Sequence, residues 1–177
     1  MKKETVFITR TGMFIALLIA LQVVTKSFGQ IVTGSCVNMI LATCVLSCGL
    51  VSAAAVAVVS PFMAFLLGIG TPIIQIVPLI ALGNLVYVAV ISVLRKRISI
   101  SGYWQDMIPV VTASFAKFLA LFLCVTKIAV PLLSLPEAKA SALCVSFSWP
   151  QLITALLGGL IATEIIRLLK KAKIPNI

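Results

Sequence analysis

One lysine in the middle of a long apolar stretch is the residue of this chain best suited to chemistry. Lys117 lies nine residues after Ile108, where an apolar segment begins, and no acid is expected at its depth. A lone cation inside a membrane is costly unless it is paired or hydrated. Lys117 therefore predicts a bound anion such as a carboxylate, or else contacts with helix carbonyls or a solvated cavity.

The neighbours of Lys117 predict which way its side chain points. Small and cationic residues recur every four or three positions and form one helical stripe: Ala113, Lys117, Ala120, Cys124 and Lys127. Bulky Phe115, Leu119 and Phe122 lie on another side, which suits lipid. We therefore expect Lys117 to face the inside of a helical bundle, with Lys127 above it toward an outer opening.

Amide side chains in the apolar segments are further candidates, because buried amides need partners. They are Asn38, Gln75, Asn84 and Gln151, with Gln30 in a polar stretch between segments. We expect several of them to hydrogen-bond to one another or to a solute. Gln75 and Asn84 face opposite sides of a straight helix, so they share a site only if Pro78 bends it. Trp149 is either an interfacial anchor or a surface on which a solute stacks.

The composition predicts the elements that position these residues. The chain has 177 residues, 62% of them hydrophobic, and a mean hydropathy of +1.23, which predicts an all-α integral membrane protein with one domain over residues 1–177. About 20 apolar residues cross a bilayer as a helix. Gly49 is expected to divide a run that is too long for one span. The predicted spans are residues 6–25, 35–49, 51–68, 73–94, 108–130 and 147–169.

The positive charge of the chain predicts its orientation. The net charge is +10, and ten of the 14 Lys and Arg residues fall in three clusters at the ends of apolar segments. The clusters are Lys2, Lys3 and Arg10; Arg95, Lys96 and Arg97; and Arg167, Lys170, Lys171 and Lys173. Six spans place all three clusters and both termini in the cytoplasm, where they meet anionic lipid rather than nucleic acid.

The connections between spans are predicted from glycine and proline. Residues 26–34 and 132–146 are expected to form outer loops, the first of which folds back over the bundle. Pro78 is expected to kink the fourth span, and the fifth span to end before Pro131. The cysteines are expected to act as small apolar residues, with a Cys36–Cys144 disulfide as the alternative.

Several functions are disfavoured by what the sequence lacks. It contains no histidine, and its four acids, Glu4, Asp106, Glu137 and Glu164, lie near predicted span ends or in loops. Proton relays need an ionisable acid or histidine in the membrane, and catalytic metals need such ligands. No nucleophile lies beside a base. We therefore expect no metal, no cofactor and no enzymatic activity.

Small residues on two predicted spans favour close helix contacts. Ala16 and Ala20 lie one turn apart in the first span and allow another helix to approach, with chance packing as the alternative. A second stripe in the last span has the same character: Gln151, Ala155, Gly158 and Ala162.

With this size, this topology, a basic N-terminus and the Ala-x-x-x-Ala pattern of Ala16 and Ala20, the chain resembles the S components of energy-coupling factor (ECF) vitamin transporters. The resemblance implies high-affinity binding of a vitamin or related micronutrient at the outer side of a bacterial plasma membrane. It also implies that Ala16 and Ala20 dock on a transmembrane T component. Two cytosolic ATPase partners would hydrolyse ATP, in agreement with the missing P-loop pattern.

Two interpretations of the function remain, and only the first includes a solute. Lys117 and Lys127, without a matching acid, favour an anionic or carboxylate-bearing vitamin, and the missing histidine disfavours nickel and cobalt. The alternative is a structural or assembly subunit that carries no solute, in which the small-residue stripes serve helix packing alone.

Overall fold

We describe residues 3–100 and 102–172 of a computed structural model. Helices make up 89% of the structure, and the described residues contain no strand. The prediction of an all-α protein is therefore confirmed. The elements, in order, are α1 (Lys3–Thr25), the 3₁₀ turn η1 (Lys26–Phe28), α2 (Gly29–Cys48), α3 (Leu50–Leu66), the 3₁₀ turn η2 (Ile74–Ile76), α4 (Val77–Arg97), α5 (Tyr103–Leu121), the π-helix η3 (Phe122–Ala129), α6 (Val130–Leu132), α7 (Glu137–Ser146) and α8 (Trp149–Lys171).

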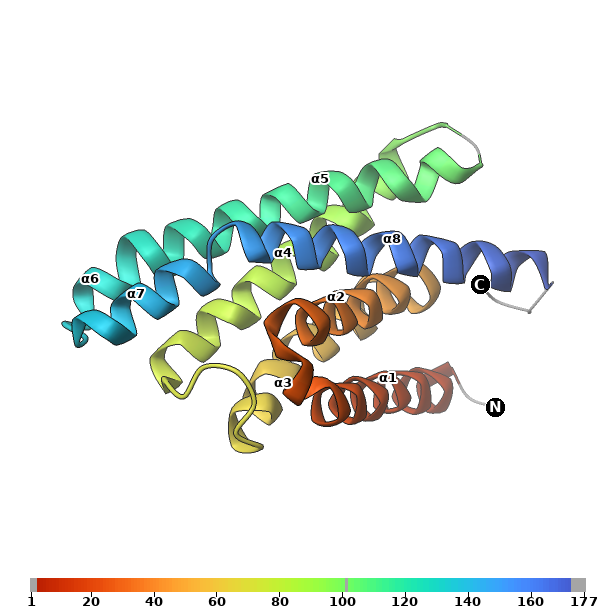
Figure 1. Ribbon diagram of the computed structural model, residues 1–177. Coiled ribbons are helices and arrows are strands. Elements are labelled where there is room, and N and C mark those ends of the chain that lie inside the picture. Colours follow the sequence, from red (N-terminus) through yellow and green to blue (C-terminus); the bar gives the residue numbers. More distant parts are fainter. Residues whose placement is uncertain (1–2, 101, 173–177) are drawn as a thin grey trace.

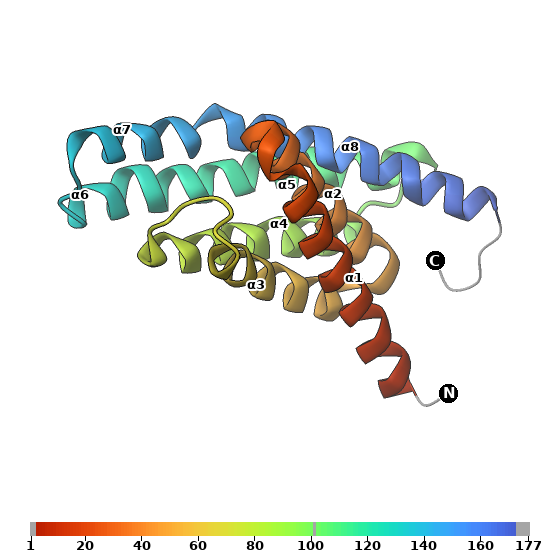
Figure 2. The same ribbon diagram turned by 60° about the horizontal axis from the view of Figure 1, so that its bottom comes forward.

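The long helices form one bundle. α1 begins and α8 ends at the same end of the molecule, and the connection from α4 to α5 lies there too (Figure 1). We call this the terminal end. α1 crosses the bundle obliquely at its edge, while the α6–α7 turn reaches to the opposite end (Figure 2). Both ends of the described chain therefore lie at the same end of the bundle.

Four helical segments are long and apolar enough to cross a membrane: Glu4–Cys48, Ile74–Arg97, Tyr103–Leu132 and Glu137–Lys171. α3 is a shorter apolar helix of 17 residues. The first segment turns back on itself at η1, so α1 and α2 form a hairpin (Figure 1). The chain is therefore a multi-pass membrane protein.

Several predicted connections are wrong in detail. Gly29, with φ +83°, reverses the chain in a short turn, so α2 begins where a loop was expected. Pro78 stands in the first turn of α4, where its missing N–H costs nothing, and does not kink the helix. The fifth predicted span was expected to end before Pro131, but its helix continues through α6 to Leu132. The backbone N–H that Pro131 lacks is therefore missing at the end of the helix.

The second expected outer loop is also largely helical, because α7 occupies Glu137–Ser146. Pro136 directly precedes this helix, in the extended conformation that often starts one. Gly49, with φ +84°, separates α2 from α3. Cys36 and Cys144 are free thiols.

α2 and α8 make the most extensive contact in the bundle. A Cβ on Gly158 would lie 2.7 Å from the backbone nitrogen of Met39, and would also meet the carbonyl oxygen of Ser35. Only glycine permits this approach of two backbones. Ala155 and Ala162, from the same small-residue stripe, are fully buried. This close packing sets where the polar residues of α2 lie.

Candidate functional site

A cavity of about 770 Å³ opens at the end of the bundle opposite the terminal end. The α1–α2 turn, the connection over residues 68–73 and α7 surround its mouth. Its floor reaches the middle of the bundle, at Asn38 of α2, Asn84 of α4 and Lys117 of α5. This volume lies within the range of small-molecule sites.

Lys117 lies at the floor and is held by two amides. Its ammonium nitrogen Nζ donates to Asn38 Oδ1 and to Asn84 Oδ1, each at 2.6 Å, and the side chain is 3% exposed. The same nitrogen lies 5.5 Å from the centre of the Tyr87 ring. An ammonium has three N–H donors, so one remains beyond those given to the amides. The amides are neutral and leave the charge of Lys117 uncompensated.

Backbone carbonyls orient both amides so that their oxygens face Lys117. Asn38 Nδ2 donates to the carbonyl oxygen of Gly34 at 2.9 Å, one turn earlier on α2. Asn84 Nδ2 donates to the carbonyl oxygen of Ala57 at 3.4 Å. That carbonyl is available because Pro61, four residues later in α3, has no N–H to bond it. A proline on one helix thus orients an amide on another.

The cavity is positively charged. Lys26, Lys117 and Lys139 line it, whereas all four acids of the chain lie elsewhere. A bound group of opposite charge is the simplest means of stabilising the buried ammonium of Lys117 away from water. Apolar residues such as Val37, Val77 and Ile80 supply the walls. The arrangement can bind an organic anion.

Two of the predicted amides lie near the mouth. Gln30 of α2 and Gln151 of α8 both line the cavity, and both donate through Nε2 to the carbonyl oxygen of Ser146, at 2.6 and 3.2 Å. They join α2 and α8 to the end of α7. Together with the floor, the cavity unites five of the predicted site residues: Gln30, Asn38, Asn84, Lys117 and Gln151.

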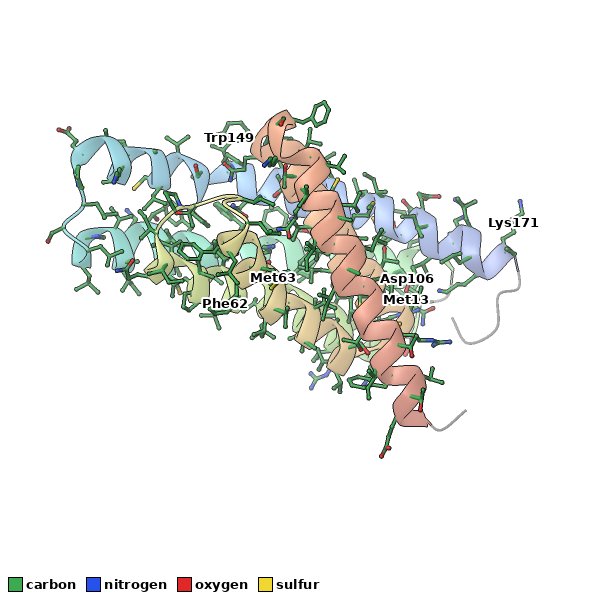
Figure 3. All side chains as sticks on the ribbon, turned by 90° about the horizontal axis from the view of Figure 1, so that it is seen from below. Met13, Phe62, Met63, Asp106, Trp149 and Lys171 are labelled. Atoms are coloured by element: carbon green, nitrogen blue, oxygen red, sulfur yellow. The ribbon has the colours of Figure 1, made fainter. Side chains whose placement is uncertain are left out.

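The other three predicted site residues lie outside this cavity. Gln75 is exposed in η2 and lines a smaller depression with Cys124. Trp149 is 61% exposed and points away from the bundle (Figure 3). Lys127 is exposed, with its nitrogen 5.5 Å from the centre of the Phe122 ring.

The position of Lys127 has a local cause. The expected stripe assumes a regular α-helix, but Phe122–Ala129 is a π-helix, which turns more slowly than an α-helix. The buried residues of the π-helix are Val125 and Ala129. Beyond Leu121, the side of the helix that faces the bundle is therefore no longer the predicted stripe. Cys124 is accordingly half-buried rather than part of the cavity lining.

Among the cavity residues that sequence reasoning missed are two buried polar ones, Gln22 of α1 and Ser60 of α3. Both line the cavity and both are buried, at 6% and 1% exposure. Gln22 carries a signal, since an amide inside an apolar span is costly without a partner. Ser60 carries a weaker one, because serine hydroxyls within helices often bond the helix backbone.

A second polar cluster, also missed, lies at the terminal end. Asp106 of α5 is 6% exposed and forms ion pairs with Arg95 Nε and Lys170 Nζ, each at 2.8 Å. Arg95 also donates through Nη1 to the carbonyl oxygen of Leu46 at 2.6 Å. We call Arg95, Asp106 and Lys170 the Asp106 cluster. It ties the ends of α2, α4 and α8 to the start of α5.

The predicted docking pair lies on the uncovered side of α1. Ala16 and Ala20 are exposed, as are Met13 and Leu17, at 67% and 49%. Figure 3 shows this side of α1 facing away from the bundle, near Met13. Such an apolar face suits lipid or another membrane helix. Within the described residues, no group of three or more His, Cys, Asp or Glu side chains is placed to hold a metal.

A multi-pass helical bundle with a cationic cavity at one end is a membrane protein built to bind a small solute. The sequence matches the family described as ECF transporter, substrate-specific component, over residues 6–170 of 177. The chain belongs to this family. It is therefore a substrate-binding subunit of an ECF transporter and a transport subunit rather than an enzyme. No curated protein and no solved structure gave a significant match.

Proposed function

We propose that this subunit binds an anionic micronutrient, such as a carboxylate-bearing vitamin, with high affinity in the cavity above Lys117. One observation carries the proposal: Lys117 is buried, contacts only neutral amide oxygens through its hydrogen bonds, and lines a cavity without acids. A carboxylate would take the remaining N–H of the ammonium and neutralise its charge.

The proposal includes the arrangement in the membrane. α1, α2, α3, α4, α5 and α8 each cross once, with α5 continued by η3 and α6, and the whole chain acts as one domain. The terminal end, which carries Arg10, Arg95 and Arg167 from the described parts of the basic clusters, faces the cytoplasm of a bacterial cell. The cavity then opens outward. Six crossings are supported by the hairpin at η1 and by the apolar character of α3.

The partners follow from family membership, which implies a T component and ATPase components. We propose that Ala16 and Ala20 form the contact with the T component and that two cytosolic ATPases hydrolyse ATP. The exposed apolar face around Ala16 supports this assignment. Co-purification of the complete transporter, with and without Ala16→Leu and Ala20→Leu, tests it. Retention of all partners by the double variant would contradict it.

The solute is tested by purifying the protein in detergent from cells grown in rich medium and identifying any retained molecule by mass spectrometry. We expect an anion in about equimolar amount, retained by the natural protein and by Lys127→Met but lost from Lys117→Met. A retained cation, or an empty protein that also fails to bind a panel of carboxylate vitamins, would contradict the proposal. The empty result would favour the structural-subunit alternative.

A further inference from the structure

Two residues that line the cavity each carry a polar atom without a partner. Gln22 Oε1 and Ser60 Oγ are buried, and neither has a hydrogen-bond partner in the described part of the chain. Burying a polar atom without a partner is unfavourable, and native proteins rarely do so without a reason. Two such atoms on one cavity indicate a polar group that the cavity takes up from outside.

The surroundings of Ser60 make its lack of a partner informative. Other serines in these helices donate to the carbonyl oxygen four residues earlier: Ser47 to Thr43 at 2.6 Å and Ser114 to Val110 at 2.8 Å. This local bond is open to any helical serine. Ser60 does not make it, although its side chain is only 1% exposed. The hydroxyl of Ser60, a residue that lines the cavity, is thus left without a partner among the described residues.

Another pair of polar side chains on α1 and α3 does form a hydrogen bond. Thr11 of α1 donates to Ser52 Oγ of α3 at 3.0 Å, near the start of both helices. Gln22 and Ser60 lie farther along the same two helices, and their side-chain oxygens form no such bond. Gln22 and Ser60 line the cavity, whereas Thr11 and Ser52 do not. The buried hydroxyl of Thr43 also lacks a partner in the described chain and lies outside the cavity, so Gln22 and Ser60 are distinguished by lining one cavity together.

The chemistry of the two side chains defines the group that would satisfy them. An amide oxygen only accepts, whereas a serine hydroxyl both donates and accepts. Neither is charged, and no acid lines the cavity. The complementary group is therefore neutral and carries an O–H or N–H, as a hydroxyl or an amide does.

We propose that Gln22 and Ser60 form a second, neutral polar subsite of the cavity, which binds a hydroxyl or amide group of the substrate. The inference rests on the proposed function, in which Lys117 holds the anionic group. It narrows the substrate class to organic acids that carry a hydroxyl or amide at a distance from the carboxylate, with an apolar part between them. Such a substrate joins α1, which carries Gln22, to α5, which carries Lys117.

A series of simple acids tests the subsite in the purified full-length protein. Binding of straight-chain carboxylates of four to eight carbons is compared with binding of the same acids bearing a terminal hydroxyl. At the chain length that spans the cavity, we expect the hydroxyl to tighten binding about tenfold, the usual effect of one added hydrogen bond. Ser60→Ala and Gln22→Met should each remove most of this gain and leave the affinity for the parent acid unchanged.

Matched controls separate a binding role from a folding role. Ser92→Ala changes a buried serine outside the cavity, and Gln75→Met changes an exposed amide; both should keep the full gain. Because Gln22 Oε1 and Ser60 Oγ have no partner to lose, their variants should unfold at the same or a higher temperature. A marked loss of thermal stability in both would show a structural role and overturn the subsite.

Failure of the subsite and failure of the proposed function give different results. If the parent acids bind in a Lys117-dependent way but the hydroxyl adds nothing at any length, the subsite is overturned and the anion site stands. The same conclusion holds if the gain survives both substitutions. If no acid of either series binds, the carboxylate site itself is contradicted, and the subsite with it.

Discussion

Lys117 and Asp106 lie on the same helix and both are buried, but their surroundings differ in charge and in contact with the cavity. Asp106 has two cations beside it, Arg95 and Lys170, and does not line the cavity that contains Lys117. Lys117 has only neutral amide oxygens as hydrogen-bond partners and lines the cavity. The charge of Asp106 is compensated within the protein, whereas no acid lines the cavity beside Lys117. Compensation within the chain thus distinguishes a structural cluster from a binding site.

Of the substitutions that test this comparison, Lys117→Met should have the largest effect on ligand affinity. We expect anion binding to weaken on the order of a hundredfold, because the charge-assisted contact is lost. Stability should change by no more than about 1 kcal/mol, since removal of an unpaired buried cation offsets the loss of two hydrogen bonds. Isothermal titration and thermal unfolding measure the two quantities. Lys127→Met, on the same helix but outside the cavity, is the control.

Asp106→Asn should show the reverse pattern. It leaves two cations side by side, and the free energy of unfolding should fall by about 2 kcal/mol, between the values for exposed and buried pairs. Ligand affinity should stay within about twofold, since the cluster lies at the other end of the bundle. Thermal unfolding with and without ligand measures both. A variant that unfolds normally but loses its ligand would contradict the division of roles.

Pro61→Ala refines the comparison by testing how the floor is oriented. The new N–H at position 61 would bond the carbonyl of Ala57 and compete with Asn84 Nδ2. Asn84 would then hold Lys117 less firmly, and we expect affinity to fall about threefold to tenfold with little loss of stability. Pro109→Ala, inside α5 and outside the cavity, is the matched control. Equal effects of the two substitutions would refute this role for Pro61.

The smallest effect is expected at the mouth. Replacing Lys26 and Lys139 by glutamine should slow anion association about threefold at low salt, with little change in dissociation, because exposed charges attract ligands from a distance. The difference should vanish at high salt. Lys96→Gln, exposed at the terminal end, should leave the rate unchanged. Stopped-flow binding at two ionic strengths gives the answer.

The sequence predicted much of the class and part of the site. Hydropathy indicates the helical membrane protein, and the spacing around Lys117 correctly predicts that its side chain points inward. The amides Asn38 and Asn84 were among the candidates, because buried amides need partners. Local spacing does not show, however, that their oxygens converge on Lys117, since that contact joins three helices.

The missed features have identifiable causes. The position predicted for Lys127 assumed a regular α-helix, but the π-helix after Leu121 changes the direction in which this side chain points. The helical start of α2 replaces an expected loop because one glycine turn suffices. The Asp106 cluster joins residues far apart in the chain, of which the predicted topology shows only that they lie near the same end.

The central claim is that Lys117 holds an anionic group in the cavity. An experimental structure of the protein with the compound it retains from rich medium tests this claim most directly. The account predicts a carboxylate or other anionic oxygen within hydrogen-bond distance of Lys117 Nζ, between Asn38 and Asn84. A neutral or cationic group at that nitrogen, or a compound bound away from the floor of the cavity, would contradict it.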